Sequence, residues 1–127
     1  MLLDQALKKM LSTDNMNKRN GNMYITKFME LVNTHLKEQH TVSFYADRLC
    51  ITPNYLNEIT NMVLNTNAKQ YIQDKIMDEA KRLLLYSNSS IAEIAFKLNF
   101  SMVAYFVRLF RKCTGSTPLV YRKEHKP

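Results

Sequence analysis

The chain has 127 residues, enough for one domain or two small abutting lobes with a modest hydrophobic core. Hydrophobic residues make up 46% and charged residues 23%, with only 2 Gly and 3 Pro, which excludes a disordered chain and favours a nearly all-α protein. The net charge of +7 favours a polyanionic partner. No apolar run approaches the roughly 20 residues of a membrane span, and the start lacks a secretory signal, so we expect a cytoplasmic protein without membrane contact.

The first 22 residues carry the weakest structural signal. Leu and Met recur there at helical spacing, but residues 12–15 and 20–22 are rich in helix breakers. We therefore expect residues 1–22 to be a linker or an N-terminal extension. From Tyr24 to about Leu36, apolar residues recur every three or four positions and predict an amphipathic helix.

A first helix-turn-helix follows this helix. We expect a short helix from Ser43 to Cys50, and then a second helix with Thr52 as its N-cap and Pro53 at its first position. Together with the preceding amphipathic helix, this pair is expected to form a first lobe over residues 23–66.

A longer helix comes next. Asn67 with Gln70 three residues later resembles a capping box, and apolar residues continue at helical spacing, so we expect a connecting helix over residues 67–86. Asp74 and Asp78 lie on this helix, but no nucleophile, glycine loop or further metal ligand accompanies them. We interpret them as solvated helix surface and expect no enzyme activity.

The remaining residues, 87–127, are expected to form a second lobe. Ser90 opens a capping box and starts a helix that ends at Asn99, a residue that tolerates left-handed geometry. Ser101 is the predicted cap of the next helix, which stops at Gly115. Thr117 and Pro118 begin a last short helix.

The two lobes repeat one another at an offset of 50 residues. Residues 55–59 align with residues 105–109, and Tyr71 aligns with Tyr121. Such similarity usually means one supersecondary unit used twice, here a helix-turn-helix. Together, the elements predicted along the chain amount to an all-α fold of about seven helices with two helix-turn-helix subdomains. Two units offer two helices to a grooved partner such as DNA. After residue 96, seven Lys or Arg residues stand against a single Glu, which favours the same partner.

Some distinctive residues are predicted to be structural. Cys50 and Cys113 have no partner at ligand spacing, so we expect both to be buried and reduced. The three histidines form no zinc pattern, and we expect neither a metal nor a cofactor. Four aromatic residues are expected in the core of the second lobe: Phe100, Tyr105, Phe106 and Phe110.

Three motifs of the second lobe carry a family resemblance. They are Ser90-Ile91-x-Glu93-Ile94-Ala95-x-x-Leu98-Asn99-Phe100, Tyr105-Phe106-x-Arg108-x-Phe110-Arg111-Lys112 and Gly115-Ser116-Thr117-Pro118-x-x-Tyr121-Arg122. They resemble the signature of the AraC family of transcriptional regulators, and the similarity extends over Tyr24–Lys123. The resemblance implies a DNA-binding domain whose two lobes, joined by a long helix, lie on one face of a duplex. Because the two recognition helices differ, we expect an asymmetric site.

The resemblance also implies which residues meet the base edges. Asn can pair with adenine, Arg with guanine and Glu with cytosine, while Val and Ala can pack on thymine methyl groups. We therefore expect a T-rich second half-site with one guanine. The implied base-reading residues are Asn54, Asn57 and Glu58 in the first lobe, and Val103, Ala104, Val107 and Arg108 in the second.

Contacts with phosphates fix the register of a protein on DNA without reading sequence. Arg111 and Lys112 occupy positions at which the family contacts phosphate. The helix starts at Ser43 and Ser90 could add backbone N–H contacts. Further expected phosphate contacts are Lys69, Lys97 and Arg122.

The first lobe departs from the family pattern. Thr60 and Asn61 replace a usual Phe-Lys pair, and Glu58 places a negative charge on a surface that should approach phosphates. We therefore expect the first lobe to bind weakly or to be selective through Glu58, and the second lobe to supply most of the affinity.

An alternative function is a degenerate AraC-like fold that docks another protein without specific DNA binding. The apolar side chains of Met102, Val103 and Val107 on a groove-facing helix favour this alternative. A steep loss of affinity with salt would separate DNA binding from protein docking. Family members generally carry a sensing or dimerisation domain, which we expect in a longer protein, together with a contact to RNA polymerase if the protein is an activator.

Overall fold

A computed structural model describes residues 21–127, and within this range the chain is all helical. The first helix is described from residue 21 to residue 35. Six further helices follow, which brings the helices of the described range to the predicted seven and confirms the all-α fold. They are α2 (Val42–Arg48), α3 (Pro53–Leu64), α4 (Ala68–Tyr86), α5 (Ile91–Lys97), α6 (Val103–Thr114) and α7 (Pro118–His125).

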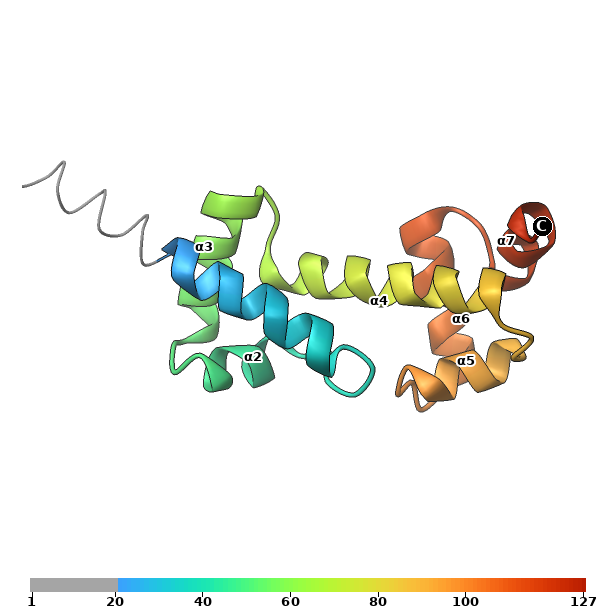
Figure 1. The fold of residues 1–127 in the computed structure, drawn as a ribbon, viewed down its shortest axis with the longest axis horizontal. Coiled ribbons are helices and arrows are strands. Elements are labelled where there is room, and N and C mark those ends of the chain that lie inside the picture. Colours follow the sequence, from blue (N-terminus) through green and yellow to red (C-terminus); the bar gives the residue numbers. More distant parts are fainter. Residues whose placement is uncertain (1–20) are drawn as a thin grey trace, which may run out of the picture.

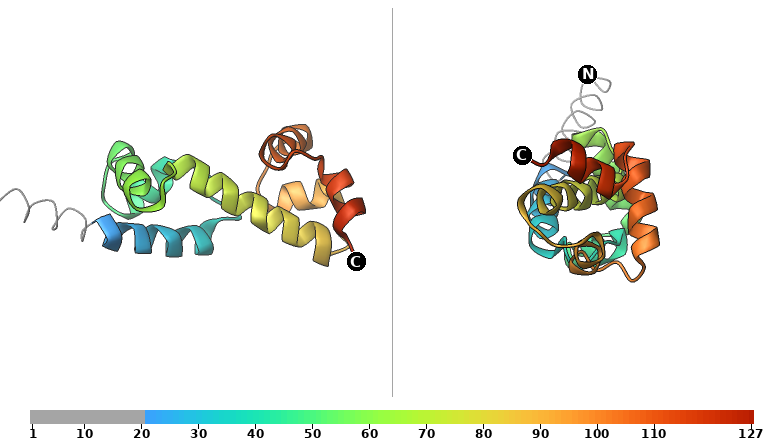
Figure 2. Two further views of the ribbon diagram at one scale, coloured as in Figure 1. Left: turned by 90° about the horizontal axis from the view of Figure 1, so that it is seen from above. Right: turned by 90° about the vertical axis from the view of Figure 1, so that its right-hand side faces the viewer.

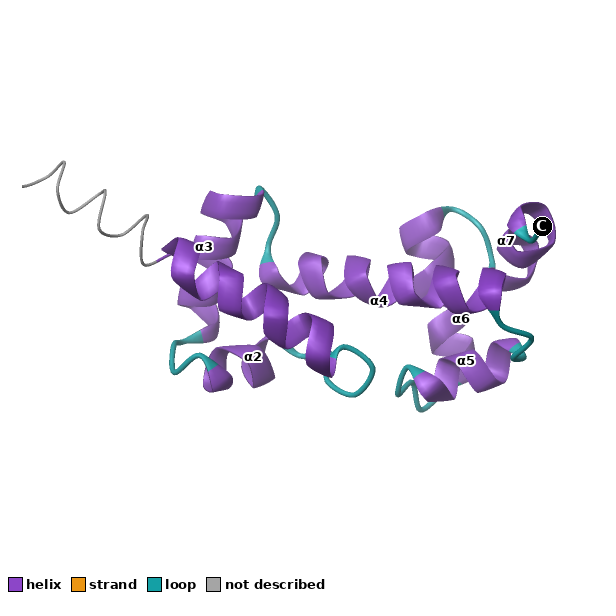
Figure 3. Ribbon diagram, viewed as in Figure 1, coloured by secondary structure: helices purple, strands orange, loops and turns teal. Residues whose placement is uncertain are grey.

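The helices are arranged as two lobes at the two ends of α4. The helix over residues 21–35 packs with α2 and α3 at the start of α4, while α5, α6 and α7 surround its end (Figure 1). Short loops join the helices within each lobe, and the chain passes from one lobe to the other through α4 itself (Figure 3). The arrangement is therefore a dumbbell whose bar is a single helix.

Side-chain caps determine where most of these helices begin. Thr52 and Thr117 accept a hydrogen bond from the backbone N–H three residues later, and each precedes a Pro at the first helical position. Asn67 caps α4 in the same way, through Oδ1 at 2.7 Å from the Gln70 nitrogen. The Gln70 side chain does not return to Asn67 but donates to Asp74, 2.8 Å away.

Residues in the left-handed region end several helices. Asn65 (φ 57°) ends α3 and Gly115 (φ 85°) ends α6, at equivalent positions of the two lobes. Asn99 (φ 64°) follows α5, as the sequence predicted.

Each lobe has an aromatic core that contacts α4. In the first lobe, Phe28 lies 5.6 Å from Tyr45 and 5.3 Å from Tyr71 of α4, measured between ring centroids. In the second lobe, Phe110 lies 6.0 Å from Phe106 and 5.6 Å from Tyr121 of α7. Buried residues occur along the whole of α4, from Ala68 to Leu84, so this helix contributes to both cores.

The C-terminal end of α4 is held by α7. The Arg122 guanidinium donates to the carbonyl oxygen of Leu84 at 3.0 Å and to that of Ser87 at 3.4 Å. Lys126 Nζ donates to the Ser87 oxygen at 3.3 Å and to Asn88 Oδ1 at 3.0 Å. These cations satisfy carbonyls that a helix end leaves without partners, and they lie at the negative end of the helix dipole.

Two predicted helix boundaries in the first lobe were wrong. Gly21 and Asn22, expected in the linker, are helical, and Gly21 is buried beside Ile59. The helix α2 was predicted to begin at Ser43 but begins at Val42, because Thr41 is extended and its hydroxyl caps the helix by accepting from the Phe44 nitrogen. Residues 1–20, the rest of the expected linker, lie outside the described residues.

The predicted cap of α6 was also wrong. Met102, not Ser101, is the N-cap residue, and no side chain caps the helix. The preceding turn explains the shift: the Phe100 nitrogen donates back to the Ala95 oxygen at 2.9 Å, and the buried Phe100 ring anchors the chain. As a result, Met102 is the residue with an extended backbone that directly precedes α6.

Two predictions of burial failed as well. Cys50 and Cys113 are both free, as expected, but exposed. Cys50 stands in the left-handed turn after α2 (φ 57°), which directs it to solvent, and Cys113 lies in the last turn of α6. Tyr105 is 49% exposed, whereas Phe100, Phe106 and Phe110 are buried as predicted, because Tyr105 lines a cavity and does not belong to the packed core.

Replacing Arg122 by Met should destabilise the fold. The substitution keeps much of the side-chain volume but leaves the carbonyls at the end of α4 without their charged donor, so we expect a loss of about 1.5–3 kcal/mol in the free energy of unfolding. Urea unfolding followed by circular dichroism measures this change. Lys123→Met, at the exposed neighbouring position, is the matched control and should stay within about 0.5 kcal/mol of the original chain; equal stability of both variants would contradict the role of Arg122.

Candidate nucleic-acid interface

The second helix of each helix-turn-helix, α3 and α6, lies on the same side of the molecule. Both run across the direction of α4, one at each end (Figure 1). Seen from above, they share one side, while the helix over residues 21–35 lies on the other (Figure 2). The 19 residues of α4 correspond to a length of about 28 Å. This length is comparable to one turn of B-form DNA, roughly 34 Å, so the two helices can face successive segments of the major groove.

On α3, two of the three predicted base-reading residues are available to a partner. Asn54 and Glu58 are exposed and stand four residues apart on one face of the helix. Asn57 is half-buried, and its Oδ1 accepts a hydrogen bond from the Ala68 backbone nitrogen at 3.0 Å. The Asn57 oxygen therefore serves as a second cap of α4, and it is not free for bidentate pairing with adenine.

Asn61 is a residue of this face that the sequence assignment did not include. It is exposed, and its position continues the spacing of Asn54 and Glu58 by three residues. In the 50-residue repeat it is also the equivalent of Arg111. Helical spacing together with the repeat was the signal that could have found it.

On α6, the predicted base-reading residues divide in the same way. Ala104 and Arg108 are exposed and lie on one face, four residues apart. Val103 packs against the hydrophobic core and is only partly exposed, as is Val107. Tyr105, which the sequence assigned to the core, is exposed next to this face. Of the three apolar residues that favoured protein docking, Met102 is exposed, whereas Val103 and Val107 are only partly exposed.

The predicted phosphate-contacting cations fall into two groups. Arg111 and Lys112 are exposed in the last turn of α6. Lys69 is exposed in the first turn of α4, and Lys97 is exposed with its Nζ 2.8 Å from Ser89 Oγ. Arg122 was assigned incorrectly, because its guanidinium faces the carbonyls at the end of α4 and is half-buried there.

The two predicted serine contacts lie at helix starts of different kinds. Ser90 is the N-cap of α5, and its hydroxyl accepts from the Glu93 nitrogen at 3.1 Å. Ser43 is exposed within the first turn of α2, one residue after the helix begins. Of the two, Ser90 occupies the capping position and Ser43 does not.

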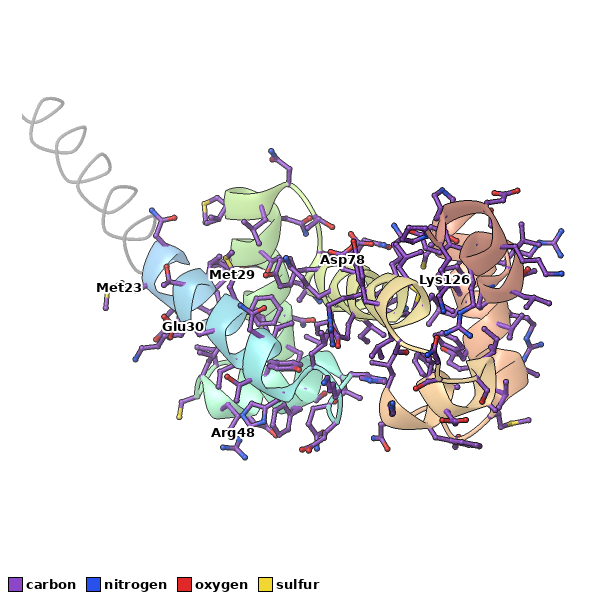
Figure 4. All side chains as sticks on the ribbon, turned by 45° about the vertical axis from the view of Figure 1, so that its right-hand side comes forward. Met23, Met29, Glu30, Arg48, Asp78 and Lys126 are labelled. Carbon is purple, nitrogen blue, oxygen red and sulfur yellow. The ribbon has the colours of Figure 1, made fainter. Side chains whose placement is uncertain are left out.

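Charge is distributed unequally between the two ends of the dumbbell. Residues 23–66 hold three Lys or Arg and four Asp or Glu, whereas residues 87–127 hold seven Lys or Arg and two Glu. Figure 4 shows charges of both signs, Glu30 and Arg48, on the first lobe, and Lys126 on the second. The second lobe is therefore the more attractive end for a polyanion.

Two other kinds of feature are absent from the described range. No group of three or more His, Cys, Asp or Glu residues in residues 21–127 is arranged to hold a metal ion. None of the helices described here has the length and apolar character needed to cross a membrane.

Known proteins resemble this chain in sequence. A family model described as a helix-turn-helix domain matches residues 45–124. The arabinose operon regulatory protein of Salmonella typhimurium is 28% identical over 94 residues, which are 73% of this chain and 34% of that protein. A bifunctional transcriptional activator and DNA repair enzyme of Bacillus subtilis, AdaA, is 26% identical over 81% of this chain and 49% of its own. The chain spans about a third to a half of these relatives.

Solved structures resemble its fold. The C-terminal domain of AraT, a response regulator from Geobacillus stearothermophilus, superimposes with a TM-score of 0.77 at 24% identity, covering 82% of this chain and 87% of that one. The DNA-binding domain of the global transcriptional factor AdpA, solved with a target DNA, gives a TM-score of 0.72 at 24% identity and covers 79% and 90%.

The family model extends over both helix-turn-helix units and the helix between them, and the regulators that match share this part of their chains. With the double helix-turn-helix and its long connecting helix present in the structure, the chain belongs to the AraC family of transcriptional regulators.

Proposed function

We propose that this chain binds double-stranded DNA in a sequence-specific manner and is the DNA-binding part of a transcriptional regulator. The observation that supports the proposal is the placement of α3 and α6 on one side of the molecule, at the two ends of α4. In this arrangement α3 and α6 enter successive major-groove segments of an asymmetric site. A solved relative of the same fold, AdpA, was crystallised with its target DNA.

Base reading falls to the exposed residues of the two recognition helices. In the first lobe, Asn54 pairs with adenine, and Glu58 accepts from the amino group of cytosine. In the second lobe, Arg108 pairs with guanine, and Ala104 packs on a thymine methyl group, with Val107 at its edge. Asn57 and Val103 have structural roles, in the capping of α4 and in the core.

Affinity and selectivity come from different lobes. The cations Arg111 and Lys112 on α6, together with Lys97 at the end of α5 and Lys69 in the first turn of α4, contact phosphates and supply most of the binding free energy. The first lobe has an excess of acidic residues and carries Glu58 on its recognition helix. The first lobe therefore contributes selectivity, because it binds poorly to sequences in which no base presents a hydrogen-bond donor to Glu58.

The wider role of the protein follows from its relatives. We propose that the regulator acts in the cytoplasm, where bacterial relatives meet DNA, and that a sensing or dimerisation domain and, for an activator, RNA polymerase are its further partners. Catalysis is not proposed for this chain, although the relative AdaA is named as a DNA repair enzyme as well as an activator.

Selection from a random pool of duplex DNA tests this function. We expect the chain to enrich one asymmetric sequence with two half-sites about one helical turn apart and a guanine in a T-rich second half-site. Affinity for the enriched sequence should fall steeply as salt rises, because phosphate contacts release counterions. No enrichment together with a weak response to salt would contradict the proposal and favour protein docking, which Met102→Asp would then impair because Met102 is 62% exposed.

Arg108→Ala should weaken binding to the selected site and relax the requirement for one guanine. The loss of a bidentate contact costs about 1–3 kcal/mol. Arg111→Ala is the matched control: as a phosphate contact, it should weaken binding to cognate and random DNA alike and lower the salt slope by about one. Fluorescence anisotropy with each of the four base pairs at the guanine position measures both effects. An unchanged base preference in Arg108→Ala would exclude Arg108 as a base reader.

Asn57→Ala and Asn57→Asp should differ in stability. Alanine removes the acceptor for the Ala68 N–H and should cost about 1 kcal/mol in the free energy of unfolding, whereas aspartate keeps an acceptor at the same place and should cost less. Thermal unfolding monitored by circular dichroism gives the comparison. If both variants unfold like the original chain while binding DNA poorly, Asn57 reads bases and does not cap α4.

A further inference from the structure

Away from α4, the two lobes meet directly at a small contact. Asn99, in the turn after α5, donates from Nδ2 to the carbonyl oxygen of Glu38 at 2.9 Å. Next to this hydrogen bond, the ring centroids of His40 and Phe100 are 5.1 Å apart. Glu38 and His40 belong to the loop after the first helix, and Asn99 and Phe100 belong to the second lobe, so this contact bridges residues 61 positions apart.

Three contacts hold the first-lobe loop over residues 37–40 in place. Lys37 Nζ lies 3.7 Å from Glu79 Oε1 of α4. Glu38 accepts the hydrogen bond from the second lobe, and the carbonyl oxygen of Gln39 accepts from the Tyr45 hydroxyl of α2 at 2.7 Å. Burial raises the pKa of Tyr45 to about 12, so the hydroxyl remains a donor at neutral pH. Consecutive residues are therefore anchored to α4, to the second lobe and to the first-lobe core.

His40 is lodged between the lobes. Its Nε2 is buried and has no hydrogen-bond partner among residues 21–127. The backbones of Leu98 in the second lobe and Leu36 in the first favour the protonated ring, but burial outweighs them and lowers the pKa of His40. The ring is therefore neutral at neutral pH, and it can pack against Phe100 without a charge to desolvate.

A cavity of about 310 Å³ lies beside this contact. The first-lobe loop, α4 and the second lobe all contribute to its walls, which shows that the lobes are not packed face to face. Its lining includes Thr41, Lys69, Gln73, Ile76, Tyr105 and Leu109. The contact at Glu38 and His40 therefore lies across an opening between the two lobes, which are otherwise connected through α4.

We propose that residues 37–40 and the Asn99–Phe100 turn form a strut that, together with α4, fixes the distance and rotation between α3 and α6. One helix alone leaves its two ends free to twist and bend relative to each other, and a second contact away from the helix axis removes these motions. The consequence for DNA rests on the proposed function: the strut determines which spacing of half-sites the chain accepts. Asn99 and His40 are thus positioning residues, which touch neither bases nor phosphates.

The strut can be tested without DNA by a distance measurement. Cys50 and Cys113 are the two cysteines of the chain, both are exposed, and they lie in different lobes. Nitroxide labels on them report the distribution of interlobe distances by pulsed electron paramagnetic resonance. We expect a narrow distribution for the original chain and a broader one for Asn99→Gly, which keeps the left-handed backbone but loses the donor, and for Asn99→Asp, which sets a carboxylate against the Glu38 carbonyl.

Glu38→Gln is the matched control for this measurement. The acceptor at Glu38 is its backbone oxygen, so the substitution removes a charge from the same loop and leaves the strut in place. We expect its distribution to match that of the original chain. His40→Ala, which removes the ring contact with Phe100 and leaves Asn99 intact, should broaden the distribution and serves as an independent variant. The proposal is wrong if the distance distributions of Asn99→Gly, Asn99→Asp and His40→Ala are all as narrow as that of the original chain.

The selected DNA site tests the consequence for spacing. Adding one base pair between the half-sites rotates one against the other by about 34–36°, and the original chain should lose at least about tenfold in affinity. The added base pair should reduce the affinity of Asn99→Gly by a factor roughly fivefold smaller, since one hydrogen bond of about 1 kcal/mol no longer opposes rotation of one lobe relative to the other. If affinity depends on half-site spacing in the same way in Asn99→Gly as in the original chain, the strut proposal is wrong. Absence of specific binding in the original chain would overturn the proposed function instead, while the distance measurement would still decide on the strut.

Discussion

Everything in this fold depends on one helix being shared by two hydrophobic cores. Buried residues run along α4 from Ala68 to Leu84, and its two ends are fixed by different lobes: the Asn57 oxygen and Asn67 hold the first turn, and Arg122 holds the last carbonyls. A helix pinned in this way cannot fray without opening a lobe. Folding of the lobes and integrity of the connecting helix are therefore one property, and α4 places α3 and α6 at its two ends.

The two lobes use the same scaffold with different surface chemistry. Asn65 and Gly115 end the recognition helices by the same left-handed turn, so the backbones correspond closely. The surfaces do not, since the first lobe has an excess of acidic residues and the second a clear excess of basic ones. The two lobes are therefore not interchangeable: Glu58 and Arg108 stand at equivalent positions of the repeat and carry opposite charges.

Two polar residues that were expected at the DNA act on the protein itself. Asn57 of α3 and Arg122 of α7 both satisfy backbone groups of α4. Periodicity could not show this, because it assigns a residue to a helix face but does not reveal which other chain segment lies opposite that face. The reverse error occurred at Tyr105, an aromatic residue that the fold leaves exposed. In each case the outcome depends on whether a distant part of the sequence packs against the side chain.

The class, the number and the order of the elements could be predicted from the sequence. Caps such as Thr52, Asn67, Ser90 and Thr117, and left-handed residues such as Asn99 and Gly115, act through neighbouring backbone groups, so local chemistry was enough to predict them. Long-range packing sets four features that these local signals do not: the placement of α3 and α6 on one side, the helical state of Gly21 and Asn22, the exposure of the cysteines and the contact of Asn99 with Glu38. These features arise from groups far apart in the chain, whose proximity is set by packing around α4 and leaves no local trace in the sequence.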